Sequence, residues 1–187
     1  KFCPTKSEIL AAGCWDETVR IYQLVANMGQ KGIVQQACVN VGAPVLDLIW
    51  YPNGQGLFVA TGDPNTNIIF LPLNSPNPTP SPIGGHQGLV CMAFAQIQNI
   101  EILMTAGLDK QLAFWMMNQQ GKWERKFNAN LPKTPTCMDV DLISNFVLLG
   151  LECDIGIYML EKLQKGDPSV QFIELLLKSP ITCVKVR

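Results

Sequence analysis

One histidine is the first candidate for chemistry in this chain. His86 is the only histidine, and an imidazole can serve as a general base or bind a metal. Catalysis would also need a nucleophile or a metal partner, and nothing in the sequence supplies one. The ring can instead be held by Asp109 and the Thr105 hydroxyl, with the Trp115 indole N–H completing the network. We therefore predict a structural set of His86, Thr105, Asp109 and Trp115, with no catalytic residue and no enzymatic activity.

The other residues with reactive or ligating side chains form no recognisable site. No C-x-x-C pair occurs, and most cysteines stand in apolar strand patterns, which favours free buried thiols and a reducing compartment. Gly54–Gly56 and Gly84–Gly85 do not follow the pattern of a nucleotide-binding loop. The sequence therefore predicts no metal, no cofactor and no small-molecule substrate. The cysteines, an odd number, are Cys3, Cys14, Cys38, Cys91, Cys137, Cys153 and Cys183.

Composition restricts the classes of partner. The 187 residues are 48% hydrophobic and 16% charged, with a net charge of -1, which favours a well-buried fold and argues against disorder. No overall basicity recruits nucleic acid. A local RNA contact at Lys122–Lys126 (KWERK) is the alternative to a solvated outer strand there. No apolar run is long enough to span a membrane, and the segment beginning at Lys1 lacks the pattern of a secretory signal.

The candidate residues must be positioned by β-strands. Leu103–Met116 (LMTAGLDKQLAFWM) reads as a strand ending in Thr-Ala-Gly, a tight turn on Asp109 and a second strand ending in Phe-Trp. Gly85-His86 precedes it. This order of Gly-His, strand, turn aspartate and strand ending in tryptophan is the signature of one blade of a WD-repeat β-propeller.

Weaker copies of this unit recur along the chain. Tyr22, Leu71, Trp115 and Tyr158 hold the aromatic position at intervals of 43 to 49 residues, close to the roughly 40–45 residues of a WD repeat. The second full copy is degraded, with leucine at the aromatic position and Asn65 in place of the turn aspartate. Four prolines within Leu73–Pro82 fit an outer edge strand and loop, with a P-x-x-P ligand as the alternative.

We therefore predict an all-β fold, a WD-repeat β-propeller of four-stranded antiparallel blades. The whole chain, 1–187, is predicted to form one partial propeller domain, about half to two-thirds of a seven-bladed ring. The approximate blade boundaries are 1–41, 42–84, 85–130 and 131–178, with the start of a further blade at 179–187.

Trp15 is the candidate binding residue. It lies in the turn between the second and third strands of the first blade, and this turn opens on the face where propellers usually bind peptides. Exposed aromatic side chains are frequent binding hot spots. Packing of Trp15 against a neighbouring blade is the alternative that position alone leaves open.

Several stretches, in order, resemble the WD-repeat mRNA export factors of the nuclear pore. The resemblance implies a non-enzymatic scaffold that binds a GLEBS-type nucleoporin peptide on the propeller face, with Trp15 in the contact surface. It also implies a nuclear location at the nuclear envelope and pore, with shuttling to the cytoplasm. We expect Asp16, Glu17, Lys110 and Glu152 to be further partner-binding residues. The matching stretches are Ala11–Asp16 with Val19–Arg20, Gly42–Gly54, Met104–Trp115, Leu131–Val140 and Glu152–Leu160.

The chain departs from the family pattern in its degraded second repeat and at two single positions, and these departures bear on peptide affinity and RNA contact. Leu108 stands where the family has a tryptophan, and Thr182 stands where a basic residue is expected. The alternatives are the mitotic spindle checkpoint scaffold of the same family and a generic WD-repeat adaptor in a ubiquitin or chromatin complex.

Overall fold

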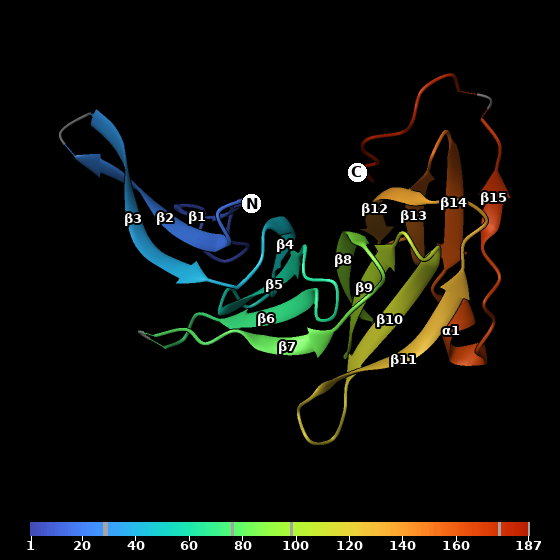
Figure 1. Ribbon diagram of the computed structural model, residues 1–187, viewed down its shortest axis with the longest axis horizontal. Helices are drawn as coiled ribbons and strands as arrows, with labels where there is room; N and C mark the ends of the chain where they lie inside the picture. Colours follow the sequence, from blue (N-terminus) through green and yellow to red (C-terminus); the bar gives the residue numbers. More distant parts are fainter. Residues whose placement is uncertain (28–29, 76, 98, 176, 187) are drawn as a thin grey trace. The chain divides into compact units, whose positions relative to one another are not determined.

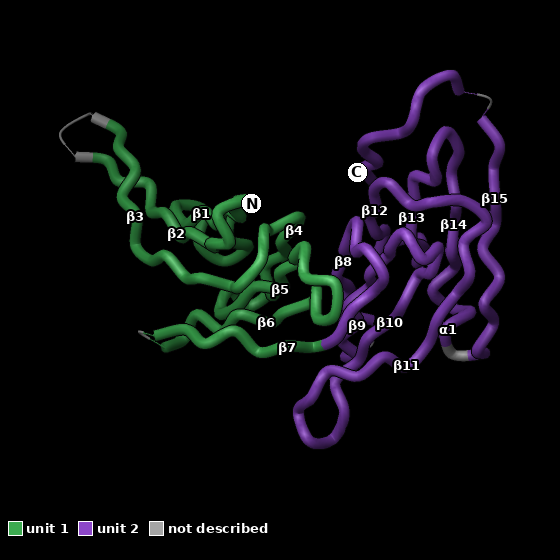
Figure 2. Tube along the Cα trace, in the orientation of Figure 1, with its two compact units in different colours: residues 1–83 green, residues 84–187 purple. Residues whose placement is uncertain are grey.

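The computed structural model describes residues 1–27, 30–75, 77–97, 99–175 and 177–186. The chain divides into two compact units, Lys1–Ile83 and Gly84–Arg187 (Figure 2). Antiparallel sheet dominates both units, and the described residues contain one short helix, α1 (Glu161–Lys165). Within the described residues, no helix is long and apolar enough to cross a membrane.

The first unit is built from two sheets whose strands follow one another in chain order (Figure 1). The first sheet has three strands, and an isolated bridge joins Phe2 to Leu10 beside its first strand. The second sheet has four. The strands are β1 (Ile9–Gly13), β2 (Thr18–Asn27) and β3 (Gln30–Asn40), then β4 (Val45–Trp50), β5 (Gly56–Thr61), β6 (Ile68–Pro72) and β7 (Ser81–Gly84).

The second unit repeats this plan with two four-stranded sheets. Helix α1 and a short connection separate the last two strands. The predicted all-β fold of WD-repeat propeller blades is thus confirmed. The strands are β8 (Leu89–Ile97), β9 (Ile100–Gly107), β10 (Gln111–Met117) and β11 (Trp123–Asn130), then β12 (Pro135–Asp141), β13 (Phe146–Leu151), β14 (Asp154–Met159) and β15 (Gln171–Ile173).

A β-bulge near the start of the first strand is common to the three four-stranded sheets. In each, the register shifts by one residue, so that one extra residue lies unpaired against the second strand. The extra residues are Leu46, Val90 and Thr136. The bulge therefore gives a structural reference point for comparing the sheets.

Counted from this bulge, the predicted aromatic positions coincide. In each sheet, the residue after the bulge pairs with a residue of the second strand, and that residue pairs in turn with one on the third strand. The aromatic position lies three residues further along the third strand, at Leu71, Trp115 and Tyr158. Tyr22 and Trp115 also share a second irregularity, because the pairing with the outer strand shifts immediately before each of them. The sequence repeat is therefore a repeat of strand register.

Each unit is held together by one apolar core between its two sheets. In the first unit Val19, Val45 and Leu57 belong to one buried cluster. In the second unit Phe114 and Tyr158 are both fully buried, and their ring centroids lie 5.0 Å apart. Burying side chains of this size contributes about 1.5–3 kcal/mol each, so these contacts fix each pair of sheets as one body.

The proline-rich and C-terminal segments differ from regular strands. Pro82 lies in β7, a strand of four residues at the outer edge of its sheet, where proline is tolerated; Pro76 lies outside the described residues.

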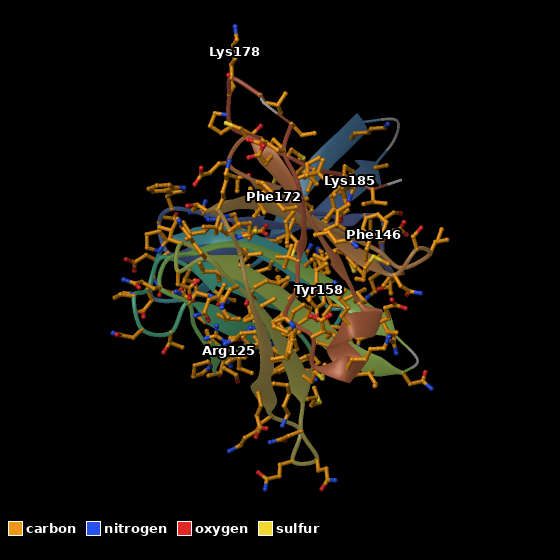
Figure 3. All side chains as sticks on the ribbon, turned by 90° about the vertical axis from the view of Figure 1, so that its right-hand side faces the viewer. Arg125, Phe146, Tyr158, Phe172, Lys178 and Lys185 are labelled. Atoms are coloured by element: carbon orange, nitrogen blue, oxygen red, sulfur yellow. The ribbon has the colours of Figure 1, made fainter. Side chains whose placement is uncertain are left out.

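The predicted strand over Ile181–Val186 does not form. Instead Ile181 N–H donates to the Glu152 carbonyl (2.6 Å), and Val186 N–H donates to the Asp139 carboxylate (2.8 Å). In Figure 3, Lys178 projects from the segment that follows β15.

Candidate functional site

A buried hydrogen-bonded network surrounds His86 in the second unit. Trp115 Nε1–H donates to the Thr105 hydroxyl oxygen at 2.8 Å. That hydroxyl lies 2.7 Å from His86 Nε2, and His86 Nδ1 lies 3.0 Å from a carboxylate oxygen of Asp109. The four predicted residues are therefore brought together: His86 from the segment between β7 and β8, Thr105 from the second half of β9, Asp109 from the β9–β10 turn and Trp115 from β10.

The network has a direction that favours a neutral histidine. Because Trp115 donates to Thr105, the threonine hydroxyl is available to donate to His86 Nε2, and Nδ1–H then donates to Asp109. Burial lowers the pKa of His86 below its ordinary value, although the nearby carboxylate of Asp109 opposes this shift. The His86 side chain has no exposed surface, so the ring is not accessible to a substrate.

Two glycines allow this close packing. A Cβ atom at Gly107 would lie 2.7 Å from the His86 Cβ and 2.9 Å from an Asp109 carboxylate oxygen. A Cβ atom at Gly84 would lie 2.6 Å from the Trp115 ring. Only a residue without a side chain fits at these positions, which makes the network a packed structural element.

The neighbouring sheets have different residues and contacts at the positions that Thr105 and Trp115 hold in the third sheet. In the second sheet, Val59 and the buried Leu71 occupy the register of Thr105 and Trp115, so the site is apolar there. In the fourth sheet, the Tyr158 hydroxyl donates to the Asp167 carbonyl at 3.0 Å. Burial raises the pKa of Tyr158 to about 12.

The turn that carries Trp15 is exposed but internally bonded. Trp15 is 80% exposed, so packing against a neighbouring blade is not what this structure shows. Asp16 accepts hydrogen bonds from the Thr18 backbone N–H (3.3 Å) and hydroxyl (2.5 Å), and it forms an ion pair with Arg20. The Thr18 hydroxyl and Arg20 together lower the pKa of Asp16. Glu17 has a φ of 67° and accepts a hydrogen bond from Val41 N–H at 2.8 Å.

The corresponding turns of the second unit carry Lys110 and Glu152. Both residues have a φ of 56°. The Lys110 carbonyl accepts from Leu131 N–H at 2.8 Å. The Glu152 carboxylate accepts from Thr134 N–H at 3.2 Å, and this hydrogen bond is the main reason for its lowered pKa, to which the charge of Lys110 also contributes. Lys110 and Glu152 thus lie close enough for their charges to interact.

Glu152 does not take the structural role of Asp109. One residue fewer lies between β13 and β14 than between β9 and β10, so Glu152 bonds to the preceding loop instead of to an imidazole. Leu108, in the β9–β10 turn, is 60% exposed. Trp15, Asp16 and Glu17 belong to the first unit, and the partner role of all five predicted residues stays a prediction.

One charged pair beside these turns was not predicted. Lys133 forms an ion pair with Asp154, whose side chain is only 2% exposed, and its ammonium lies 5.4 Å from the centre of the Phe172 ring. Asp154 also accepts from Leu175 N–H at 2.9 Å. The bonded carboxylate of Asp154 raises the pKa of Lys133. No local sequence pattern predicts this pair, because Lys133 lies in the loop before β12 and Asp154 begins β14.

The Lys122–Lys126 segment uses its aromatic and basic side chains within its own sheet. Trp123 contacts Phe94 edge to face, with centroids 6.3 Å apart. Arg125 lies over the Trp115 ring at 5.7 Å, and Lys126 pairs with Glu124 at 2.5 Å. Trp123, Arg125 and Lys126 thus have contacts within the sheet, and an RNA contact at this segment stays an untested alternative.

The thiols and acidic groups form no ligand set in the described residues. All seven cysteines are free, and no cluster of three potential metal ligands occurs in the described part of the chain. Cys3 and Cys91 are buried as expected, but Cys38 and Cys183 are exposed.

Comparison with known proteins gives three relatives. The chain is 30% identical over 189 residues to the mRNA export factor rae-1 of Caenorhabditis elegans, covering 100% of this chain and 48% of that protein. It is 28% identical over 144 residues to Protein Rae1 of Drosophila melanogaster, covering 75% and 39%, respectively. Human Coronin-7 is 26% identical over 183 residues, covering 96% and 18%. No protein-family model matches. The chain thus spans about half or less of each relative's length.

Proposed function

Because the chain belongs to the Rae1-type family of WD-repeat proteins, we propose that it acts in mRNA export as a non-enzymatic scaffold. In this proposal it works in the nucleus and at the nuclear pore, shuttles to the cytoplasm, and holds a GLEBS-type nucleoporin peptide on the turns that carry the predicted binding residues, which are the β1–β2, β9–β10 and β13–β14 turns. The similarity to the mRNA export factor rae-1 favours export over the checkpoint and adaptor alternatives.

The observation that supports the proposal most directly is the exposed Trp15 on a turn held by its neighbours' hydrogen bonds. An indole has few rotatable bonds and a large contact surface, so it loses little conformational freedom when it is buried by a partner. The hydrogen bonds of Asp16 to Thr18 and its ion pair with Arg20 hold the turn before any partner arrives. A side chain presented in this way binds without the further cost of ordering its loop.

The polar residues of the other turns supply orientation. Glu17 lies two residues after Trp15 in the same turn, so a basic group of the peptide could pair with its carboxylate. Lys110 offers a cation on the second unit, and Glu152 offers a carboxylate already oriented by Thr134 N–H. Charges at the rim of an interface mainly set orientation and association rate, so we assign these residues a smaller share of the affinity than Trp15.

The proposed function also explains why the sole histidine is enclosed. His86 donates and accepts within its own sheet, and its ring has no exposed surface. A scaffold needs rigid turns, and this network fixes the base of the β9–β10 turn. We therefore assign His86 to positioning the turn.

Titration calorimetry with a GLEBS-type nucleoporin peptide tests the proposal. We expect Trp15→Ala to weaken binding by about 2 kcal/mol, or roughly thirtyfold in Kd, as is typical of an aromatic hot spot. Ile143→Ala is the matched control, because Ile143 is 91% exposed and lies in the β12–β13 turn, at the other end of β13 from Glu152.

The fold of each variant is checked by circular dichroism and thermal unfolding. Equal affinity of Trp15→Ala and the parent protein, with both folded, would remove Trp15 from the binding surface. Failure of the folded parent protein to bind any GLEBS-type peptide would contradict the proposed function itself.

A further inference from the structure

The outer edge of β3 differs from the other three outer edges in the chain. An outer strand exposes unpaired backbone N–H and C=O groups, and natural sheets usually protect such edges with short strands, prolines or charges. Strand β7 has four residues and contains Pro82, and β15 has only three residues. Strand β11 carries consecutive charged residues at Glu124–Lys126. Three outer edges therefore have protection of the expected kind.

Strand β3 has none of these protections along most of its length. It is eleven residues long, QKGIVQQACVN, with no proline and a single charged residue, Lys31. It lies at the edge of the order β1-β2-β3, and no described strand pairs with its other side. Its bulge lies at Gln36, so the segment up to Gln35 pairs regularly with β2. Lys31–Gln35 is thus a regular edge that is open to another strand.

This segment also continues past the rest of its sheet. Strand β1 pairs with β2 only as far as Gln23, whereas β2 and β3 remain paired beyond that point (Figure 1). Leu24 and Ile33 are directly opposite each other and are 37% and 63% exposed, and Val34 is 45% exposed. A two-stranded ribbon is only marginally stable in water, so an added strand would stabilise it.

We propose that β3 pairs with β3 of a second copy of this chain, antiparallel about a two-fold axis at Ile33. The pairing joins two three-stranded sheets into one. It places Ile33 opposite Ile33 of the partner subunit, and on this face the two isoleucines lie between the two copies of Leu24. Such a row of apolar cross-strand neighbours is the unit of sheet stabilisation.

The opposite face of the ribbon is also self-complementary. Val34 of each copy lies opposite Gly32 of the other copy, so a branched side chain faces a residue without one. Val25 already spreads toward Gly32, where an added Cβ would lie 3.4 Å from the valine Cγ2. Lys31 lies opposite the uncharged Gln35, so the two lysines are at opposite ends of the paired segment. These features favour a second copy over an unrelated strand.

A charge exchange at Ile33 tests this arrangement in the full chain by sedimentation velocity. Ile33→Lys places two ammonium groups opposite each other, and Ile33→Glu places two carboxylates opposite each other. We expect each variant alone to raise the dimer Kd by about tenfold or more, and an equimolar mixture to restore dimers. Restoration by mixing also shows that the variants fold. Asn130→Lys, which adds the same charge on β11, is the matched control and should leave the dimer unchanged.

Three outcomes would overturn the proposal. The first is a parent protein that remains monomeric up to about 100 μM, because a Kd above this gives less than roughly 5.5 kcal/mol of association energy. The second is single variants that dimerise as well as the parent, and the third is an equimolar mixture that stays monomeric. Dimers that are abolished equally by Asn130→Lys would place the contact on another edge.

Discussion

Replacing Thr105 by valine tests the buried network most directly. The hydroxyl of this fully buried residue accepts from Trp115 Nε1–H and lies 2.7 Å from His86 Nε2. Valine has nearly the same shape but neither donates nor accepts, so both groups lose this partner while packing is preserved.

The expected destabilisation follows from these two losses. A buried polar group that loses its partner costs about 1–3 kcal/mol, and Trp115 is only 4% exposed while the His86 ring has no exposed surface. Allowing for the extra apolar contact of the new methyl group, of about 0.8 kcal/mol, we expect Thr105→Val to lower the free energy of unfolding by about 2–4 kcal/mol. That is a large fraction of the roughly 5–15 kcal/mol that stabilises a typical domain.

Amide hydrogen exchange over β9 and β10 measures this change locally, because it reports on the second unit whether or not the two units unfold together. Thr105→Ser is the matched control, since it keeps the hydroxyl and removes one methyl group, at a cost of about 1 kcal/mol. If Thr105→Val costs no more than Thr105→Ser, the hydroxyl does not stabilise the network and the argument from its geometry is wrong. Combining Thr105→Val with Trp115→Leu, as in the second sheet, should cost less than the two single changes together.

Two further predictions concern the same network. Because burial holds the pKa of His86 below its value of about 6.5 in the unfolded chain, the unfolded state binds more protons below that pH. The stability of the second unit should be fully present above pH about 6.5 and fall as the pH drops toward the folded pKa; equal urea midpoints for this unit at pH 7.5 and 5.5 would contradict this. Gly107→Ala should destabilise the protein by about 1–3 kcal/mol, because its Cβ would lie 2.7 Å from the His86 Cβ. Gly62→Ala, whose Cβ would meet nothing closer than 3.8 Å, is the control, and equal thermal midpoints for the two variants would refute the packing argument.

Strand positions were predictable because one physical constraint fixes both the sequence and the register. Side chains on a strand alternate between faces, so a one-residue slip would expose the whole apolar set. Trp115 and Tyr158 therefore keep the same register although their sheets differ in hydrogen bonding. The recurrence of an aromatic residue near the end of the third strand was sufficient to align the sheets, and even Leu71, where the side chain is not aromatic, is buried at the same place.

Features that depend on one residue more or less were not predictable. The shorter turn before β14 moves the Glu152 carboxylate to Thr134 N–H, and composition gives no sign of that deletion. The Lys133–Asp154 pair joins positions 21 residues apart, and it depends on how two loops meet. The segment after Ile181 has the alternation of a strand, but a strand forms only beside a partner, and no described residue pairs with this segment as a strand.

The two turn aspartates explain why Trp15 is the better candidate for binding than Leu108. Asp109 is directed inward, where it orients His86, and its turn is thereby tied to the core. Asp16 holds the equivalent position, because each aspartate lies three residues before the first buried residue of its strand. Asp16 bonds to Thr18 and Arg20 at the surface, where Asp109 bonds to a buried histidine. The first turn is therefore stabilised by bonds among its own surface side chains and not by a bond to a buried residue. Trp15 on this turn is 80% exposed while the turn that carries it is held in place, which is the combination that a peptide-binding anchor requires.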